Sequence, residues 1–305
     1  MSEVRLRPIA ADEGHALYGL FRASLAALLD RYTEPWQYDA DDDAATWPAW
    51  AGLYGHLHAQ CDLALAAEVD GALAGYARSM RRADVRELTE FFVAPGAAGA
   101  GVGRRLLDAV LPTEAGVMRL IIATGDPSAQ SRYIRAGFAT HAHLLELDGV
   151  AGSHPELAPV TDLVAAPLDL ADPAHLDAVA AIDEAVLGHR RDVDQRFYAA
   201  ERTGRRFLRD GRVVGYGWIG SRTGPVAALD PADLPAMLHA LEAVAVEQGR
   251  TEIGWNVPGT AQPAAAWLLA RGFRLWRMPV FLMSDGPALP GRFDRYVVTS
   301  PPFFL

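Results

Sequence analysis

Apolar residues gather in short blocks along the chain, and two groups of these blocks have the same pattern. LALAAEV and ALAGYARSM flank Asp70-Gly71 in the first group, and RRFLR and RVVGYGWIG flank Asp210-Gly211 in the second. Asp-Gly between two strand-like blocks is typical of a β-hairpin with a two-residue turn. Each group therefore predicts a pair of antiparallel strands.

A second pair of matching segments follows the hairpins in the same order. The helical pattern PSAQSRYI leads to Gly137-Phe138, the pattern AQPAAAWLL leads to Gly272-Phe273, and an apolar, strand-like segment follows each. Glycine at this place ends a helix, because it adopts the left-handed conformation without steric cost. Two matches in one order predict an internal duplication, in which each half consists of strand, helices, hairpin, strand, helix, strand, helix and strand.

The boundary between the halves is expected where periodicity is lost. The segment DGVAGSHPELAP, residues 148–159, is rich in glycine and proline and has no helical or strand pattern. We therefore predict an α/β protein with domains at residues 1–148 and 160–305, joined by a linker at residues 149–159. The first copy is longer than the second before its hairpin, and the excess falls in residues 32–50.

Composition narrows the class of function. A formal net charge of -10 argues against a nucleic-acid partner. The chain contains no lysine, which excludes a phosphate-binding loop ending in Gly-Lys, a kinase lysine and Schiff-base chemistry. Its single cysteine, Cys61, cannot form an intrachain disulfide, and no apolar run approaches membrane-spanning length. We therefore expect a cytoplasmic protein without a nucleic-acid or membrane partner.

A glycine-rich segment connects a predicted strand at Val85–Val93 to a helix that begins near Gly101. Such a turn is an anion site, because small residues let the main chain approach the ligand and the free amides at the helix start attract phosphate. The dinucleotide fingerprint fits poorly: the glycine after Gly99-Ala100-Gly101 is Gly103, one place early, and the segment follows a hairpin. A nucleotide-dependent oxidoreductase is therefore the weakest of the alternatives.

The same segment resembles the GNAT superfamily of N-acetyltransferases. Val93-Ala94-Pro95 and Gly101-Val102-Gly103 match the family's coenzyme A loop, and Tyr133 with Gly137-Phe138 matches its second signature. Two positions depart from the pattern: Ala98 stands where arginine or glutamine is usual, and Asp126 stands where asparagine is usual. The resemblance covers residues 4–147 and implies acetyl-CoA as cofactor.

This resemblance implies two tandem GNAT domains, each with a central mixed, mostly antiparallel sheet flanked by helices. It also implies a set of residues that bind acetyl-CoA through main-chain amides and nearby side chains: Phe91, Phe92, Val93, Ala98, Gly99, Ala100, Gly101, Val102, Gly103, Arg104, Asp126 and Tyr133. Arg104 or the main chain would supply the polar contact that Ala98 lacks.

The resemblance further implies three candidates for proton transfer. Tyr133 matches the general acid that protonates the leaving thiolate, although it could simply pack the helix against the sheet. Glu87 matches the general base that activates the amine, and Glu90 is the second candidate. The alternative for Glu87 is a surface ion pair with a neighbouring arginine; these are Arg81, Arg82 and Arg86.

The second copy resembles the fold without the site. In place of the glycines it has Asp230, Pro231 and Pro235, and Leu268 stands in the position of Tyr133. Carboxylates repel a diphosphate, and prolines lack the amide that would bind it. We expect this copy to pack against the first copy or form a wall of its acceptor groove, with the ending FDRYVVTSPPFFL as a closing strand.

The acceptor is expected to be an amine of a small molecule or a peptide. Residues 32–50 could form its pocket, with aromatic walls and carboxylates for a cationic amine, or could be an acidic turn that caps a helix over packed tryptophans. The aromatic and acidic residues concerned are Trp36, Tyr38, Trp47, Trp50, Asp39, Asp41, Asp42 and Asp43.

Other residue patterns predict no separate chemistry. The pairs His56/His58 and His141/His143 lack a third ligand at metal spacing, and Cys61 is expected to be a small core residue. If the chain does not catalyse acetyl transfer, the alternative is a non-catalytic acyl-CoA-binding or scaffolding protein with the same fold.

Overall fold

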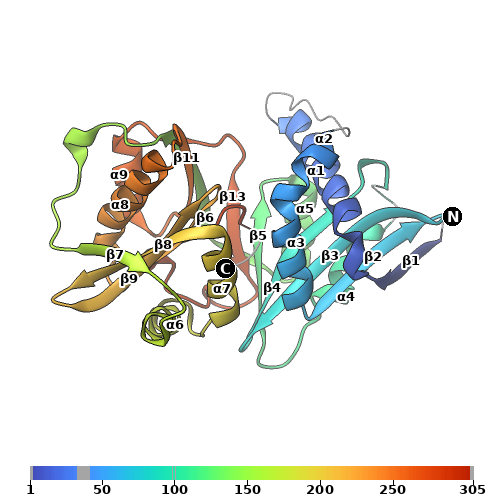
Figure 1. Cartoon of the computed structure of the whole chain (residues 1–305). Coiled ribbons are helices and arrows are strands. Elements are labelled where there is room, and N and C mark those ends of the chain that lie inside the picture. Colours follow the sequence, from blue (N-terminus) through green and yellow to red (C-terminus); the bar gives the residue numbers. More distant parts are fainter. Residues whose placement is uncertain (1–2, 33–41, 98, 100, 303–305) are drawn as a thin grey trace. The chain divides into compact units, whose positions relative to one another are not determined.

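The computed structural model describes residues 3–32, 42–97, 99 and 101–302 (Figure 1). These residues form two compact units, Met1–Ala139 and Thr140–Leu305. Along the part of the chain that is described, no helix is long and apolar enough to cross a membrane.

The first unit has a mixed, mostly antiparallel sheet with strands in the order β1-β2-β3-β4-β5, in which only β4 and β5 are parallel. Its strands are β1 (Val4–Pro8), β2 (Leu63–Val69), β3 (Ala72–Arg82), β4 (Val85–Val93) and β5 (Met118–Thr124). Its helices are α1 (Gly14–Tyr32), α2 (Asp42–Thr46), α3 (Pro48–Gln60), α4 (Val102–Val110) and α5 (Pro127–Arg135). The predicted fold class, a mixed sheet flanked by helices, is confirmed.

Helices cover both faces of this sheet. On one face, Phe21 of α1 lies 4.9 Å from Phe92 between ring centroids, and Tyr54 of α3 shares a hydrogen bond with Tyr76. On the other face, α4 comes so close to β3 that a Cβ on Gly75 would lie 3.1–3.2 Å from two of its side chains, Val102 and Leu106. Figure 1 shows α1 and α3 in front of the strands.

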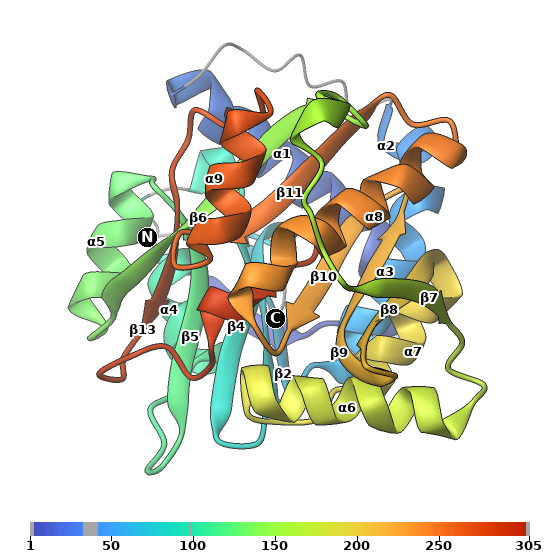
Figure 2. The ribbon, with the colours of Figure 1, turned by 90° about the vertical axis from the view of Figure 1, so that its left-hand side faces the viewer.

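The second unit has a five-stranded antiparallel sheet in the order β14-β10-β9-β8-β7 and a second group of strands in which β6 pairs with β11, β12 and β13 (Figure 2). The strands are β6 (Ala139–Val150), β7 (Val164–Leu168), β8 (Arg202–Arg209), β9 (Arg212–Gly220), β10 (Thr223–Ala228), β11 (Glu252–Pro258), β12 (Arg274–Leu275), β13 (Val280–Ser284) and β14 (Tyr296–Val297). The helices are α6 (Pro173–Leu187), α7 (Asp192–Glu201), α8 (Leu234–Glu247) and α9 (Gln262–Ala270).

The two predicted hairpins are built in the same way. Asp70 and Asp210 both have φ of 51°, and the glycine after each also has a positive φ, as a type I′ turn requires. Both hairpins contain a register shift at the same distance from the turn, between Ala67/Glu68 in β2 and between Phe207/Leu208 in β8. Equal turns with equal irregularities support the internal duplication.

The second glycine of each hairpin allows a helix to pack closely. A Cβ on Gly215 would lie 2.6 Å from Met237 of α8 and 2.9 Å from the carbonyl oxygen of Ala227, and Gly75 makes the corresponding approach to α4 and to the carbonyl of Phe92. Any side chain at these positions would push the helix from the sheet. The shared glycine therefore reflects the same helix packing in both units.

The compact units divide before the expected linker at residues 149–159. The reason is β6, which pairs with β11 along its length, so that Leu147 lies opposite Trp255 in the core of the second unit. The extents of the two sequence copies stay a prediction, because a strand can belong to one copy by sequence and to the other unit by packing.

Candidate active site

A β-bulge in β4 decides where the two candidate bases point. Met80 pairs with Glu87 and Arg78 pairs with Glu90, so that β4 uses one residue more than β3 between these pairs. The extra residue is Thr89, whose hydroxyl donates to the carbonyl of Arg78 at 3.1 Å. Residues paired across two antiparallel strands project from the same face. Both glutamates therefore lie on the α1/α3 face, although their spacing of three in a regular strand would separate them.

Glu90 belongs to a buried polar cluster. Arg78 donates to one of its oxygens at 2.6 Å and the hydroxyl of Tyr76 donates to the other at 2.8 Å, while the Tyr54 and Tyr76 hydroxyls lie 3.1 Å apart. The Glu90 side chain is 0% exposed. Burial, followed by the Glu90 charge, raises the pKa of Tyr76 and keeps it protonated as a donor. These contacts occupy both oxygens of Glu90 and make it a structural acceptor in this arrangement.

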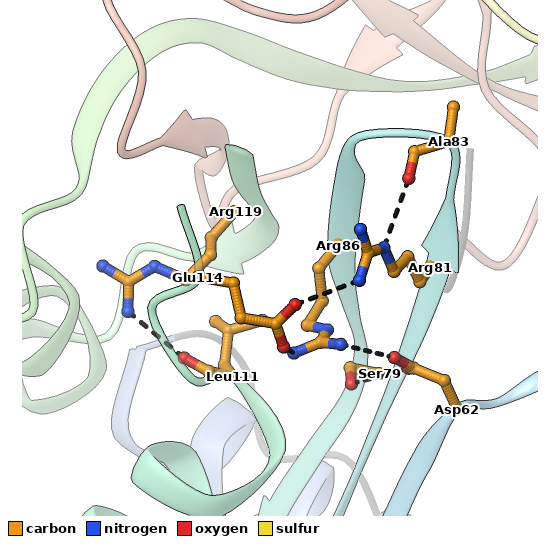
Figure 3. A network of polar contacts seen from close by, with 8 residues as sticks. All are labelled: Asp62, Ser79, Arg81, Ala83, Arg86, Leu111, Glu114 and Arg119. Carbon is orange, nitrogen blue, oxygen red and sulfur yellow. Dashed lines mark hydrogen bonds and ion pairs between the residues drawn. The ribbon is translucent and has the colours of Figure 1, made fainter. Parts of the chain in front are cut away.

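Arg86, the residue before Glu87, belongs to an ion-pair cluster that fixes the start of β4 (Figure 3). The buried guanidinium of Arg86 contacts Asp62 at 2.7 Å and Glu114 at 2.5 Å, and Arg81 contacts Glu114 at 3.0 Å. These pairs join the start of β4 to the segments that precede β2 and β5. Two arginines that sequence alone offered as partners of Glu87 are therefore paired with other carboxylates.

The second half of β4, residues 89–93, has an open edge on the side of β5. Registered pairs between β4 and β5 cover only Val85–Met118 to Leu88–Ile121, and within the described residues no pair between these strands follows. Residues 89–93 continue the strand and remain paired with β3. The carbonyl of Val93 accepts from the hydroxyl of Ser24 at 3.1 Å, and the remaining main-chain groups on the β5 side are available to an extended ligand that adds to the strand edge. Phe91, Phe92 and Val93 lie in this part of β4.

The glycine segment leads from this edge into α4. Gly99 and Gly101 have φ of 90° and 81°, and a Cβ on either would meet nothing within 4 Å. The amide of Arg105 makes the first helical bond, to the carbonyl of Gly101, so the amides of Val102, Gly103 and Arg104 precede the regular bonding of the helix. This arrangement fits an anion. Ala98 and Ala100 lie outside the described residues.

Tyr133 of α5 lies on the opposite face of the sheet from the two glutamates. Its ring centroid is 6.3 Å from that of Phe91, which pairs with Ala77 and points away from the Arg78–Glu90 face. Burial raises the pKa of Tyr133 well above its ordinary value, so the phenol keeps its proton. The structure therefore brings Tyr133 to the open edge of β4 but does not bring it to the side of Glu87.

Asp126 caps the start of α5. Its carboxylate accepts from the amide of Ala129 at 3.1 Å and lies 3.8 Å from Arg31. Aspartate and asparagine are about equally good at this capping position, so the departure from the family pattern keeps the helix start intact.

The described part of residues 32–50 packs against α1 and α3. Asp43 is buried and forms an ion pair with Arg22 at 2.9 Å. Trp47 lies 5.7 Å from the ring of Tyr18, and Trp50 lies 5.5 Å from Phe21. These contacts favour packing tryptophans and a paired carboxylate over an open pocket at these positions, while Asp42 is exposed at the start of α2. The structure does not describe four further candidates: Trp36, Tyr38, Asp39 and Asp41.

Histidines and Cys61 lie in ordinary structural positions. His141 hydrogen-bonds Ser284 at 2.9 Å and His143 packs on Phe281, both within the second unit, while His56 and His58 lie on α3. Burial raises the pKa of the Cys61 thiol, which donates to a carbonyl of α3. Among the described residues, no group of three or more metal-ligating side chains is present.

In the second unit, the strand edge that corresponds to the open edge of β4 is filled by the chain itself. β10 pairs with β9 on one side and with β14 on the other, where Val226 lies opposite Val297. The amide of Val298 then donates to the carbonyl of Asn256 in β11 at 2.8 Å. The ending of the chain therefore includes a closing strand between β10 and β11, as expected; its last three residues are not described.

The counterpart of the glycine segment in this unit also differs. The Asp230 side chain accepts from the amide of Ala232 at 2.9 Å, and Asp233 forms a 2.7 Å ion pair with Arg209. Leu268, at the position of Tyr133, is fully buried in the apolar core. This turn is acidic and contains prolines, and its carboxylates are engaged in local bonds; carboxylates repel a diphosphate, and prolines lack the amide that would bind it.

Comparisons with known proteins agree with this geometry. Residues 40–154 match the family model described as an acetyltransferase (GNAT) domain. The matched residues include β2 to β5, the glycine segment and α5 of the first unit and β6 of the second. A comparison with curated proteins finds no significant match.

Solved structures extend the likeness to the GNAT fold over nearly the whole chain. A GCN5-related N-acetyltransferase from Sphaerobacter thermophilus is 16% identical, with a TM-score of 0.62 over 93% of this chain and 96% of that one. A Pyrococcus horikoshii protein with a proposed acetyltransferase assignment gives 0.68 at 15% identity over 96% and 92%. A tandem GNAT protein from the clavulanic acid biosynthesis pathway gives 0.56 at 15% identity over 94% and 100%. At these identities the likeness shows the fold alone.

Sequence reasoning missed the buried partners of Glu90 and the position of Arg132. Tyr76, Arg78 and Glu90 come together only because the bulge at Thr89 sets the register, and nothing in the sequence marks that bulge. Arg132 precedes Tyr133 in the signature, yet its side chain lies beside Gly103 of α4.

Proposed function

We propose that the first unit transfers an acetyl group from acetyl-CoA to an amine of a small molecule or peptide. The observation that carries the proposal is the open edge of β4 beside the glycine-lined start of α4. The GNAT domain match supports the same activity. An extended ligand with a diphosphate at one end fits this combination, because a strand edge binds amide groups and a helix start binds phosphate.

Three groups of residues would hold acetyl-CoA. The amides of residues 99–104 would bind the diphosphate, with residues 98 and 100 contributing through the same segment. The main chain of residues 91–93 would bind the pantetheine arm. Asp126, at the start of α5, and Tyr133, on the side of α5 that faces Phe91, would border the thiol end of the pantetheine arm.

When bound, acetyl-CoA supplies the acetyl group as a thioester. Glu87, on the α1/α3 face, would accept the proton of the attacking amine, since a carboxylate at the acceptor side can act as general base. Tyr133, on the other face, would donate its proton to the leaving sulfur; burial raises the pKa of the phenol, so the proton is present when the thiolate leaves. Glu90 would keep Tyr76 and Arg78 in place rather than move a proton.

We also propose that the second unit does not bind acetyl-CoA. Its corresponding strand edge is paired with Tyr296–Val297, and its turn before α8 carries Asp230 and Pro231. A ligand would have to displace a buried strand of the same chain before it could add to β10.

The cytoplasmic location proposed for the chain rests on its composition alone.

Release of free thiol from acetyl-CoA tests the proposal directly. We expect release to depend on an added amine when the protein is incubated with a panel of amino acids, polyamines, aminoglycosides and peptides. No thiol release and no binding of coenzyme A would reject the proposal. Binding without release across the panel, unaffected by Tyr133→Phe, would instead indicate a non-catalytic acyl-CoA-binding protein.

A further inference from the structure

The glycine segment of the first unit contains no charged or polar side chain. Residues 94–102 are alanine, proline, glycine and valine only. Main-chain amides can orient a diphosphate, but they leave its two negative charges without a counterion. Arg104, the next cation along α4, is exposed and Arg105 donates to the carbonyl of Val4, so a further cation close to the segment would come from another element.

Arg132 of α5 is the cation that the fold places there. A Cβ built on Gly103 would lie 2.9 Å from its Nη1 and 3.0 Å from its Cζ, so the guanidinium occupies the space beside the second residue of α4. The same guanidinium lies 5.6 Å from the centroid of the Phe91 ring. One side chain thus connects the start of α4, the open edge of β4 and the helix of Tyr133.

This guanidinium has no carboxylate partner within the described residues. Other arginines of the first unit do: Arg7 pairs with Glu13, Arg78 with Glu90, and Arg86 with Asp62. The start of a helix carries partial positive charge, so a cation held there without a counterion is electrostatically unfavourable. Packing on Phe91 keeps it in place, and an anion bound to the α4 amides would turn the repulsion into attraction.

We propose that Arg132 binds the diphosphate of coenzyme A and supplies the positive charge that residues 94–102 lack. The inference rests on the proposed function, and it assigns this role to Arg132 instead of Arg104, whose side chain is exposed. Gly103 and Arg132 act as a matched pair, because a side chain at residue 103 would displace the guanidinium. Arg132 also adjoins Tyr133 in sequence, so binding of the diphosphate by Arg132 would hold α5, the helix that carries the proposed general acid, in place.

Isothermal titration with three ligands tests the role. Coenzyme A and 3′-dephospho-coenzyme A both carry the diphosphate, whereas pantetheine carries none. Arg132→Met keeps an unbranched side chain on Phe91 and removes the charge, and Arg132→Lys keeps the charge without the planar fork. Arg212→Met, at an exposed position of the second unit, is the control for net charge.

We expect Arg132→Met to weaken the binding of coenzyme A and of its 3′-dephospho form by about 10- to 100-fold each, the range for a lost charge-assisted hydrogen bond. The affinity of Arg132→Met for pantetheine should equal that of the wild type. The affinity of Arg132→Lys for coenzyme A should lie between those of the wild type and Arg132→Met, and Arg212→Met should bind coenzyme A as the wild type does. The melting temperature of ligand-free Arg132→Met should equal or exceed that of wild type, because a repulsive charge is removed.

Three results would overturn the inference. Unchanged coenzyme A binding in Arg132→Met would show that Arg132 does not contact the ligand. A loss that disappears with 3′-dephospho-coenzyme A would move the contact to the 3′-phosphate. An equal loss for pantetheine, with a lower ligand-free melting temperature, would show a structural role. Wild-type protein that binds none of the ligands would refute the proposed function itself.

Discussion

The buried pair Arg78–Glu90 gives the sharpest test of how the candidate site is built. The two residues are 1% and 2% exposed, and the carboxylate also accepts from Tyr76. Glu90→Gln keeps the size of the side chain and removes its charge, which leaves the guanidinium of Arg78 buried without a counterion. Breaking a buried pair in this way costs about 3–5 kcal/mol of unfolding free energy.

Thermal and denaturant unfolding measure this loss. One kcal/mol corresponds to about 3–4 °C for a domain of this size, so the melting temperature of the first unit should fall by about 10–20 °C. Arg78→Met combined with Glu90→Gln removes both charges and should recover part of the loss, since the two changes act on one interaction. Arg81→Met provides the control, because Arg81 and Glu114 form an exposed pair whose loss costs less than about 1 kcal/mol.

If Glu90→Gln and Arg81→Met unfold at the same denaturant concentration, the Arg78–Glu90 pair does not stabilise the first unit as proposed. The reasoning is also refuted if Glu90→Gln keeps its full stability and loses only turnover. That second result would make Glu90 the general base and Glu87 a bystander.

Three further predictions concern catalysis and the second unit. Glu87→Gln should lower kcat/KM by about 10²- to 10⁴-fold with little change in melting temperature, the range for loss of a general base; a change of less than about 3-fold would assign the base elsewhere. Tyr133→Phe should lower kcat and leave the Kd of coenzyme A unchanged. Because burial raises the pKa of Tyr133, the activity of the wild type should not decline on the alkaline side below about pH 10; a pH–rate profile measures this. Arg271→Met should leave the buried Glu242 charge unpaired, lower stability by about 3–5 kcal/mol in denaturant unfolding, and not alter coenzyme A binding by the protein that remains folded.

Local features of the sequence predicted the local features of the fold. Asp70-Gly71 and Asp210-Gly211 predicted hairpins because few other pairs adopt two positive φ values, and both hairpins are present. Gly101 marked the start of α4, where it has a left-handed conformation. Each of these inferences depends on the conformational preference of one or two residues, and that preference is independent of the rest of the chain.

Features that depend on distant pairing were not predictable from the sequence. The face on which Glu90 lies depends on the bulge at Thr89, and alternation alone would put it opposite Glu87. β6 follows the first signature in sequence, yet it packs in the core of the second unit because its partner β11 is there. Such pairings are set by the energies of the whole sheet rather than by the residues of one segment.

The placement of Arg132 has the same origin. Its sequence neighbours indicate a helix, and only the packing of α5 beside α4 brings its guanidinium to Gly103. The contribution of this residue to a phosphate site could not be inferred from spacing in the sequence, because the two residues come from different helices.

Titration calorimetry with acetyl-CoA tests the central claim, that one unit binds the donor and the other does not. Gly103→Glu places a carboxylate at the second position of α4, and Pro235→Glu places one at the second position of α8, its counterpart in the second unit. The account predicts one site per chain for wild type and for Pro235→Glu, with equal Kd values, and no detectable binding for a folded Gly103→Glu. Two sites per wild-type chain, or undiminished binding by Gly103→Glu, would contradict it.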